Sequence, residues 1–205
     1  MVYAFLHWNG NKYVGAHRGT QWYSEGMEGK EPEFVEEGQL REDRHAAVID
    51  ERRRTLVSAL KSGEYPQTFN VLRREASIGF SAGFCCLGVA CDVAVRDGLQ
   101  LDVKVEPGGR YTYGVAGVGG DRSQTRLPEA ARLWYGFESS DPYLKVPRRF
   151  VEINESVARL WAPDWICVAS ALNDDCKLTL PQIGECFQFT FLRDDWEAEH
   201  GADAS

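Results

Sequence analysis

Apolar residues recur at helical spacing in four stretches of the chain. In the first, residues 44–62, the apolar positions share one helix face: Ala46, Ile49, Leu56, Val57 and Leu60. Gly63 follows directly, and glycine there suits the left-handed conformation that ends many helices. The same reasoning predicts helices at 84–97, 128–135 and 180–192.

Other segments are typical of β-structure. Residues 3–16 predict a hairpin, because apolar residues flank Asn9-Gly10, a dipeptide that favours a tight type I′ turn. A second hairpin is predicted where residues 101–105 alternate apolar and polar ahead of Pro107-Gly108-Gly109. The short apolar run 150–153 predicts a strand. The expected fold is therefore α+β, a single domain of about four helices packed on short antiparallel strands.

Charged residues are unevenly distributed along the chain. Residues 25–43 carry eight acids and two bases, a net of −6, and residues 194–203 carry five acids and no base. We therefore expect a β-hairpin region at 1–24, an acidic linker at 25–43, a globular α+β domain at 44–193 and an acidic tail at 194–205. Acidic stretches of this kind are most often solvated.

The net charge and the lengths of the apolar runs exclude some classes of protein. The net charge of −8 disfavours general binding to duplex nucleic acid, which needs a basic face. Without a run of about 18 apolar residues, no membrane span is expected. The N-terminus has no basic region before its apolar residues, so we expect no secretory signal. In a reducing compartment the six cysteines are then expected to be thiols.

The run from Gly83 to Asp92 holds three of those cysteines, two of them adjacent. Cys85 and Cys86 fall in the first turn of a predicted helix, where unpaired N–H groups and the helix dipole lower a thiol pKa and favour nucleophilic chemistry. No histidine forms a recognisable Cys-His signature, so packing of small residues, helped by Gly88, is the alternative. The spacing of the cysteines does not suit zinc, and no metal or cofactor is expected.

Two polar clusters offer further candidates. Asn173-Asp174-Asp175 follows an apolar element, where Asp174 and Asp175 could serve as catalytic carboxylates or simply form a turn through local hydrogen bonds. Arg52-Arg53-Arg54 points around the first helix and is typical of a solvated face. Together with Arg73 and Arg74, these arginines are the clustered candidates for a nucleotide-binding pocket.

Residues 56–187 resemble a family of small uncharacterised bacteriophage proteins, common in phages of actinobacteria and other hosts. The matching pieces are 60–67, the Cys-Cys-Leu-Gly-Val-x-Cys-Asp motif within 84–92, Leu127-Pro128 with Trp134 and Gly136, the Leu-Asn-Asp motif within 171–174, and 180–183. Residues 68–83 lengthen the family's usual spacing between the first two pieces. The resemblance implies phage origin and action in the host cytoplasm, and it carries no established activity.

The best-matched pieces begin or end predicted elements, and residues at such edges carry function more often than core residues do. We therefore expect one ligand-binding cleft formed by six residues: Tyr65, Gln67, Cys85, Cys86, Asn173 and Asp174. The leading hypothesis is a phage accessory protein that binds a host protein or a small ligand and counteracts a host defence, as a decoy, an inhibitor or a nucleotide-signal sponge. The alternatives are a cysteine- or carboxylate-dependent hydrolase or transferase, and a structural component of the virion.

Overall fold

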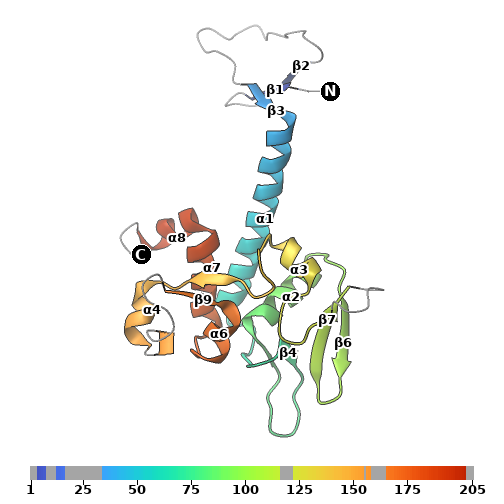
Figure 1. Ribbon diagram of the computed structural model, residues 1–205, viewed down its shortest axis with the longest axis vertical. Coiled ribbons are helices and arrows are strands. Elements are labelled where there is room, and N and C mark those ends of the chain that lie inside the picture. Colours follow the sequence, from blue (N-terminus) through green and yellow to red (C-terminus); the bar gives the residue numbers. More distant parts are fainter. Residues whose placement is uncertain are drawn as a thin grey trace. The chain divides into compact units, whose positions relative to one another are not determined.

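The computed structural model describes residues 4–7, 13–16, 34–115, 122–154, 156–157 and 165–201, with side chains from Glu42 onward except Ile153. The chain divides into two units, residues 1–48 and 49–205. Figure 1 shows the order of helices and short strands along the chain. The combination of helices with separate antiparallel sheets confirms the predicted α+β class.

The first unit contains a three-stranded antiparallel sheet in the order β2-β1-β3. Strands β1 (Ala4–His7) and β2 (Tyr13–Ala16) pair with Phe5 opposite Gly15, which confirms the predicted hairpin. Its Asn9-Gly10 turn lies outside the described residues. Strand β3 (Phe34–Glu36) adds to the other edge of β1 and was not predicted.

Helix α1 spans Glu37–Lys61 and begins earlier than the sequence suggested. The prediction of a linker up to residue 43 is wrong for residues 34–43. Strand β3 occupies 34–36, and good helix formers such as glutamate and glutamine extend the helix before its apolar stripe starts. The predicted apolar positions Leu56, Val57 and Leu60 are buried. Gly63, at φ 76°, follows the helix in the left-handed conformation.

A four-stranded sheet in the order β5-β4-β7-β6 lies in the second unit (Figure 1). Strands β6 (Asp102–Glu106) and β7 (Arg110–Gly114) confirm the second predicted hairpin, and β7 also pairs with β4 (Arg73–Arg74). Strand β4 in turn pairs with β5 (Gly83–Phe84). Because β6 is an edge strand, Val105 remains exposed while its partner Tyr111 is buried.

Helix α2 (Cys86–Arg96) follows β5 directly, and most of its residues are buried. Helix α3 (Glu129–Trp134) is preceded by Pro128, whose fixed backbone suits the start of a helix. Both agree with the predicted helices. After α3 the chain turns at Gly136, which has φ 61°.

The segment between α3 and the last helices contains a two-stranded sheet of β8 (Tyr143–Lys145) and β9 (Ile166–Val168), with α4 (Arg148–Ile153) between them in sequence and α6 (Ala169–Asp174) after them. The predicted strand at 150–153 is wrong, since these residues belong to α4. Pro147 precedes the helix, and Arg148 pairs with Glu152 one turn later at 3.0 Å.

Helix α7 (Leu180–Phe191) has the predicted capping box, in which Thr179 and Gln182 bond each other's backbone N–H groups. Helix α8 (Arg193–His200) occupies most of the predicted acidic tail. The tail prediction is wrong for residues 194–200, because Trp196 is fully buried and anchors this otherwise charged segment. Its ring packs on Phe189 and stacks on His200, with centroid distances of 5.1 and 3.8 Å.

Candidate functional site

The three motif segments singled out in the sequence meet in the second unit. The Gln67 Nε2 group donates to Asn173 Oδ1 at 3.0 Å and to the Leu178 carbonyl at 2.8 Å. In return, Asn173 Nδ2 donates to the Thr68 carbonyl at 3.0 Å. The two side-chain amides therefore connect the segment after α1 with the end of α6.

The cysteine segment joins the same junction through its backbone. Phe84 N–H donates to the Pro66 carbonyl at 2.8 Å, and Thr68 N–H donates to the Phe84 carbonyl at 2.9 Å. A Cβ at Gly83 would lie 2.8 Å from the Pro66 oxygen, so only glycine lets these two segments come this close. This pairing fixes Phe84, and hence Cys85 and Cys86, directly beside Gln67.

The carboxylate of Asp174 belongs to this network. Its Oδ1 accepts hydrogen bonds from the Asn70 N–H at 2.9 Å and from Asn173 Nδ2 at 2.6 Å. Asn70 has φ 63°, a left-handed conformation that asparagine tolerates better than most residues. Asp174 thus holds the turn at Asn70 in place, whereas Asp175 lies exposed at the end of α6.

Both thiols of the adjacent pair are buried. Cys85 is the N-cap residue of α2 and Cys86 its first residue, as the sequence suggested. The Cys86 thiol donates to the Ala169 carbonyl at 3.4 Å. Its hydrogen bond with the Cys85 thiol, together with burial, raises the pKa of Cys86 well above the ordinary value. The expectation of a lowered pKa is therefore wrong for Cys86, since the hydrogen bond with Cys85 and the loss of hydration together outweigh the helix dipole.

Gly88 explains how α2 comes to be so deeply buried. A Cβ at this position would lie 1.6 Å from the Leu72 carbonyl oxygen, so the helix backbone packs directly against the chain entering β4. The Cys85 N–H donates to the same Leu72 carbonyl at 3.0 Å. This close approach is the alternative that the sequence offered for the cysteine run, namely small residues that permit tight packing.

Tyr65 lies apart from the two amides and faces α2. Its hydroxyl donates to Asp92 Oδ2 at 2.8 Å and accepts a hydrogen bond from Arg96, while its ring meets Phe84 edge-on. Arg73 approaches Asp92 from β4 at 3.7 Å. Burial, followed by the hydrogen bond to Asp92, raises the pKa of Tyr65. Asp92 was not among the predicted site residues, although its position four residues before Arg96 signals a helical ion pair.

One family model matches a stretch that begins at the first residue of the second unit. A family model described as "Domain of unknown function (DUF8296)" matches residues 49–190, which is more than half of the chain. The chain belongs to the DUF8296 family. No curated protein and no solved structure shows significant similarity to it.

Within the DUF8296 domain, the arginine run of α1 is less solvated than predicted. Arg53 donates from Nε to the Tyr135 carbonyl at 3.0 Å and from Nη2 to the Gly136 carbonyl at 3.1 Å. Arg52 donates to the Trp134 carbonyl at 3.1 Å and stacks on the same residue's ring. The prediction of a solvated face is wrong for these two arginines, because they satisfy the carbonyl groups at the end of α3.

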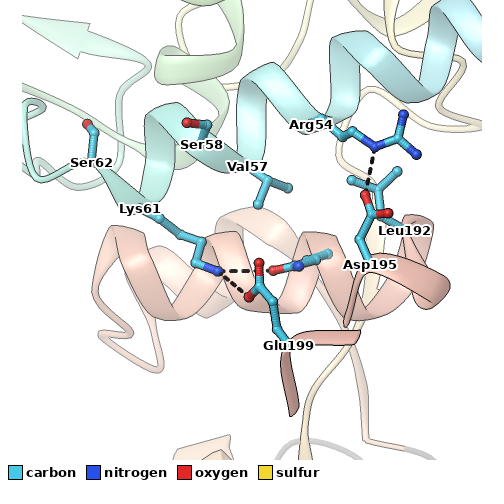
Figure 2. Close-up of a pocket in the computed structure, with 9 residues that line it drawn as sticks. Arg54, Val57, Ser58, Lys61, Ser62, Leu192, Asp195 and Glu199 are labelled. Carbon is cyan, nitrogen blue, oxygen red and sulfur yellow. Dashed lines mark hydrogen bonds and ion pairs between the residues drawn. The ribbon is translucent and has the colours of Figure 1, made fainter. Parts of the chain in front are cut away.

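The second unit also has a groove between α1 and the α7–α8 pair, with a volume of about 520 Å³. Figure 2 shows Arg54 facing Asp195 and Lys61 facing Glu199 across it. The two ion pairs measure 2.7 and 2.9 Å, and Lys61 also donates to the buried Gln188 at 3.1 Å. The charged groups that line the groove therefore bond one another. None of the six predicted cleft residues lines this groove.

The described part of the chain has neither a metal-binding cluster nor a membrane-spanning helix. There, no group of three or more His, Cys, Asp or Glu side chains is placed to hold a metal ion. Of the described helices, none combines the length and apolar character needed to cross a bilayer. The motif residues of the DUF8296 domain form a packed, hydrogen-bonded junction.

Proposed function

We propose that this protein is a non-catalytic bacteriophage accessory protein that acts in the host cytoplasm by binding a host protein. The proposal rests on the hydrogen bonding and burial of the motif residues. Gln67 and Asn173 bond each other and nearby carbonyls, and Cys86 is buried with a raised pKa. Residues used in this way stabilise a scaffold, whereas a nucleophile needs access and a base.

The distribution of histidines supports the same proposal. Among the described side chains, none of the histidines bonds a thiol. His200 stacks on Trp196 and lies 3.3 Å from Arg149 Nη2. A cysteine hydrolase would need a histidine or an equivalent base within hydrogen-bonding reach of its thiol.

Charge pairing favours a protein partner over a nucleotide. A nucleotide-signal sponge would need free arginines, but Arg52 and Arg53 bond α3 and Arg73 lies between the rings of Phe84 and Tyr111. A phosphate-mimicking decoy would need free acids. Asp195 and Glu199 are paired with α1, which reduces the negative charge that α8 presents.

The proposal is tested by native mass spectrometry of the affinity-tagged chain after incubation with an actinobacterial lysate. The expected result is a stoichiometric complex with one protein, which dissociates on denaturation. A released nucleotide would replace the protein partner with a small ligand. A chain that keeps its own mass alone in the lysates of several hosts would contradict the binding function.

A further inference from the structure

Residues 75–82 form a hairpin that extends beyond the four-stranded sheet, and we call it the finger (Figure 1). At its end, Ser77 and Phe80 exchange both backbone hydrogen bonds, at 3.0 and 2.9 Å. Gly79 takes φ 80° in the turn between them, a conformation that favours glycine. At its base, the Glu75 N–H donates to the Gly109 carbonyl of the neighbouring hairpin at 2.8 Å. Backbone hydrogen bonds therefore close the finger at its end and join its base to the sheet.

The side chains at the end of the finger are apolar and open to solvent. Ile78 is 102% exposed and Phe80 is 58% exposed. The Arg74 guanidinium lies 4.0 Å from the Phe80 ring centroid and orients that ring from the base of the finger. No charged residue occurs from Ala76 through Cys91. Turn positions usually carry polar residues, so a rigid turn that presents isoleucine and phenylalanine is unusual for a surface facing only water.

We propose that the finger is the contact with the host protein, and that it inserts Ile78 and Phe80 into an apolar pocket on that partner. The inference rests on the proposed binding function and assigns its surface. Two neighbouring apolar side chains on a convex turn match a concave receptor, the usual arrangement at the energetic centre of an interface. Because the turn is already ordered, binding loses little conformational entropy.

Two other binding partners for the finger, a lipid bilayer and a second copy of the chain, fit the observations less well. A bilayer would attract a loop rich in Lys and Arg, whereas residues 75–82 contain none. The preceding Arg73 and Arg74 pack on the rings of Tyr111 and Phe80, and the chain carries a net charge of −8. A second copy of the chain would have to offer an apolar pocket. The groove described above is instead bordered by the ion pairs of Arg54 with Asp195 and Lys61 with Glu199.

The test places the photoreactive residue p-benzoylphenylalanine at position 80 of the full chain, and at position 105 as a control. Val105 is 50% exposed on edge strand β6 of the same sheet. After irradiation in actinobacterial lysate, we expect one cross-linked protein from position 80 and none from position 105. Adding Ile78→Asp should reduce that cross-link at least tenfold, whereas Ile78→Leu should preserve it. Equal thermal unfolding of the variants verifies that the fold is intact.

Each other outcome overturns the inference in a distinguishable way. If the tagged chain still retains its partner and Ile78→Asp has no effect, the finger is not the contact but the binding function stands. Cross-linking of the chain to itself, with association lost in Ile78→Asp, identifies a second copy as the occupant. Sedimentation with phosphatidylcholine–phosphatidylserine vesicles that depends on Ile78 identifies a membrane. If no partner is retained at all, the inference and the proposed function both fail.

Discussion

The side chains of Gln67 and Asn173 are 106 positions apart in sequence and share a hydrogen bond of 3.0 Å. Asn173 is fully buried, and each of its polar atoms has a partner. The bond joins the chain leaving α1 to the end of α6, beside the buried thiols. It explains why the Leu-Asn-Asp and Tyr-Pro-Gln pieces occupy a common place in the fold without requiring that either act on a substrate.

Replacing Asn173 by alanine should destabilise the domain by roughly 1–3 kcal/mol, because the Thr68 carbonyl is left without its side-chain donor and Gln67 loses one acceptor. Urea unfolding followed by circular dichroism measures the change. The matched control is Asp175→Ala at the exposed neighbouring end of α6, which should stay within about 0.5 kcal/mol of the original chain. Equal effects at the two positions would contradict the structural role of Asn173.

Replacing Gly88 by alanine should be among the most damaging single changes. The added Cβ would meet the Leu72 carbonyl at 1.6 Å, and a backbone atom cannot move aside as a flexible side chain can. We expect a loss of about 3 kcal/mol or more, at or beyond the upper end of ordinary overpacking. Differential scanning calorimetry would record a greatly lowered unfolding temperature or no folded protein.

Gly184→Ala on α7 is the control for that prediction. Its Cβ would lie 3.0 Å from the Leu60 Cβ and 3.1 Å from the Lys61 Cγ, contacts that small movements relieve. Alanine also has a higher helix propensity than glycine, by about 1 kcal/mol. We therefore expect a change of less than about 1 kcal/mol in either direction. A Gly88→Ala protein as stable as Gly184→Ala would contradict the close packing of α2.

The two neighbouring arginines of α1 should respond differently to lysine. Arg53 bonds two carbonyls at the end of α3 through separate nitrogens, a geometry that a lysine ammonium cannot reproduce. Arg53→Lys should therefore lower the free energy of unfolding by about 1–2 kcal/mol. Arg54→Lys keeps its charge beside Asp195 on the surface and should change stability by less than about 0.5 kcal/mol. Chemical unfolding of both variants in parallel distinguishes them, and a larger effect at Arg54 would be inconsistent with the structure.

Stability should fall at alkaline pH. Burial raises the pKa of Cys91, Cys186 and Tyr113. Above about pH 8.5 the thiols of the unfolded chain lose their protons while the folded chain keeps them, so unfolding becomes more favourable. Each such thiol contributes up to about 1.4 kcal/mol per pH unit in this range and nothing below it.

Unfolding free energies measured from pH 6 to pH 10 test the alkaline prediction. The expected curve is level up to about pH 8 and then descends. Cys91→Ala should reduce the slope of that descent even if the variant is less stable at neutral pH. A curve that stays level to pH 10, or one whose slope Cys91→Ala does not change, would show that these thiols are not buried as described.

The sequence correctly predicts those helices and hairpins whose defining residues lie close together in the chain. Helix α7 has both its capping box and its apolar stripe within a dozen residues, and the hairpin of β6 and β7 has its glycine-rich turn between the two strands. Helix α8 has no such stripe. A single apolar residue, Trp196, secures it, and its acids suggest a solvated tail until Lys61 and Arg54 are seen to pair with them.

The character of the site depended on contacts that sequence cannot reveal. The cysteine pair does lie at the start of a helix, but its burial follows from the approach of Gly88 to Leu72, which a pattern within 83–92 does not contain. Likewise, the partners of Arg53 are carbonyl groups 82 and 83 positions away, and any residue type could have supplied them. Long-range backbone contacts are independent of side-chain identity, so no local motif records them.

The central claim is that the motif residues build a scaffold and do not perform chemistry, and thiol labelling tests it most directly. The native chain would be treated with iodoacetamide at pH 6, and modification at each of the six cysteines would be measured by mass spectrometry, with a sample unfolded at pH 8 as the control. We expect Cys85 and Cys86 to stay unmodified in the native chain and to react fully once unfolded. Rapid modification of either one at pH 6 would reveal an accessible thiolate and contradict the account.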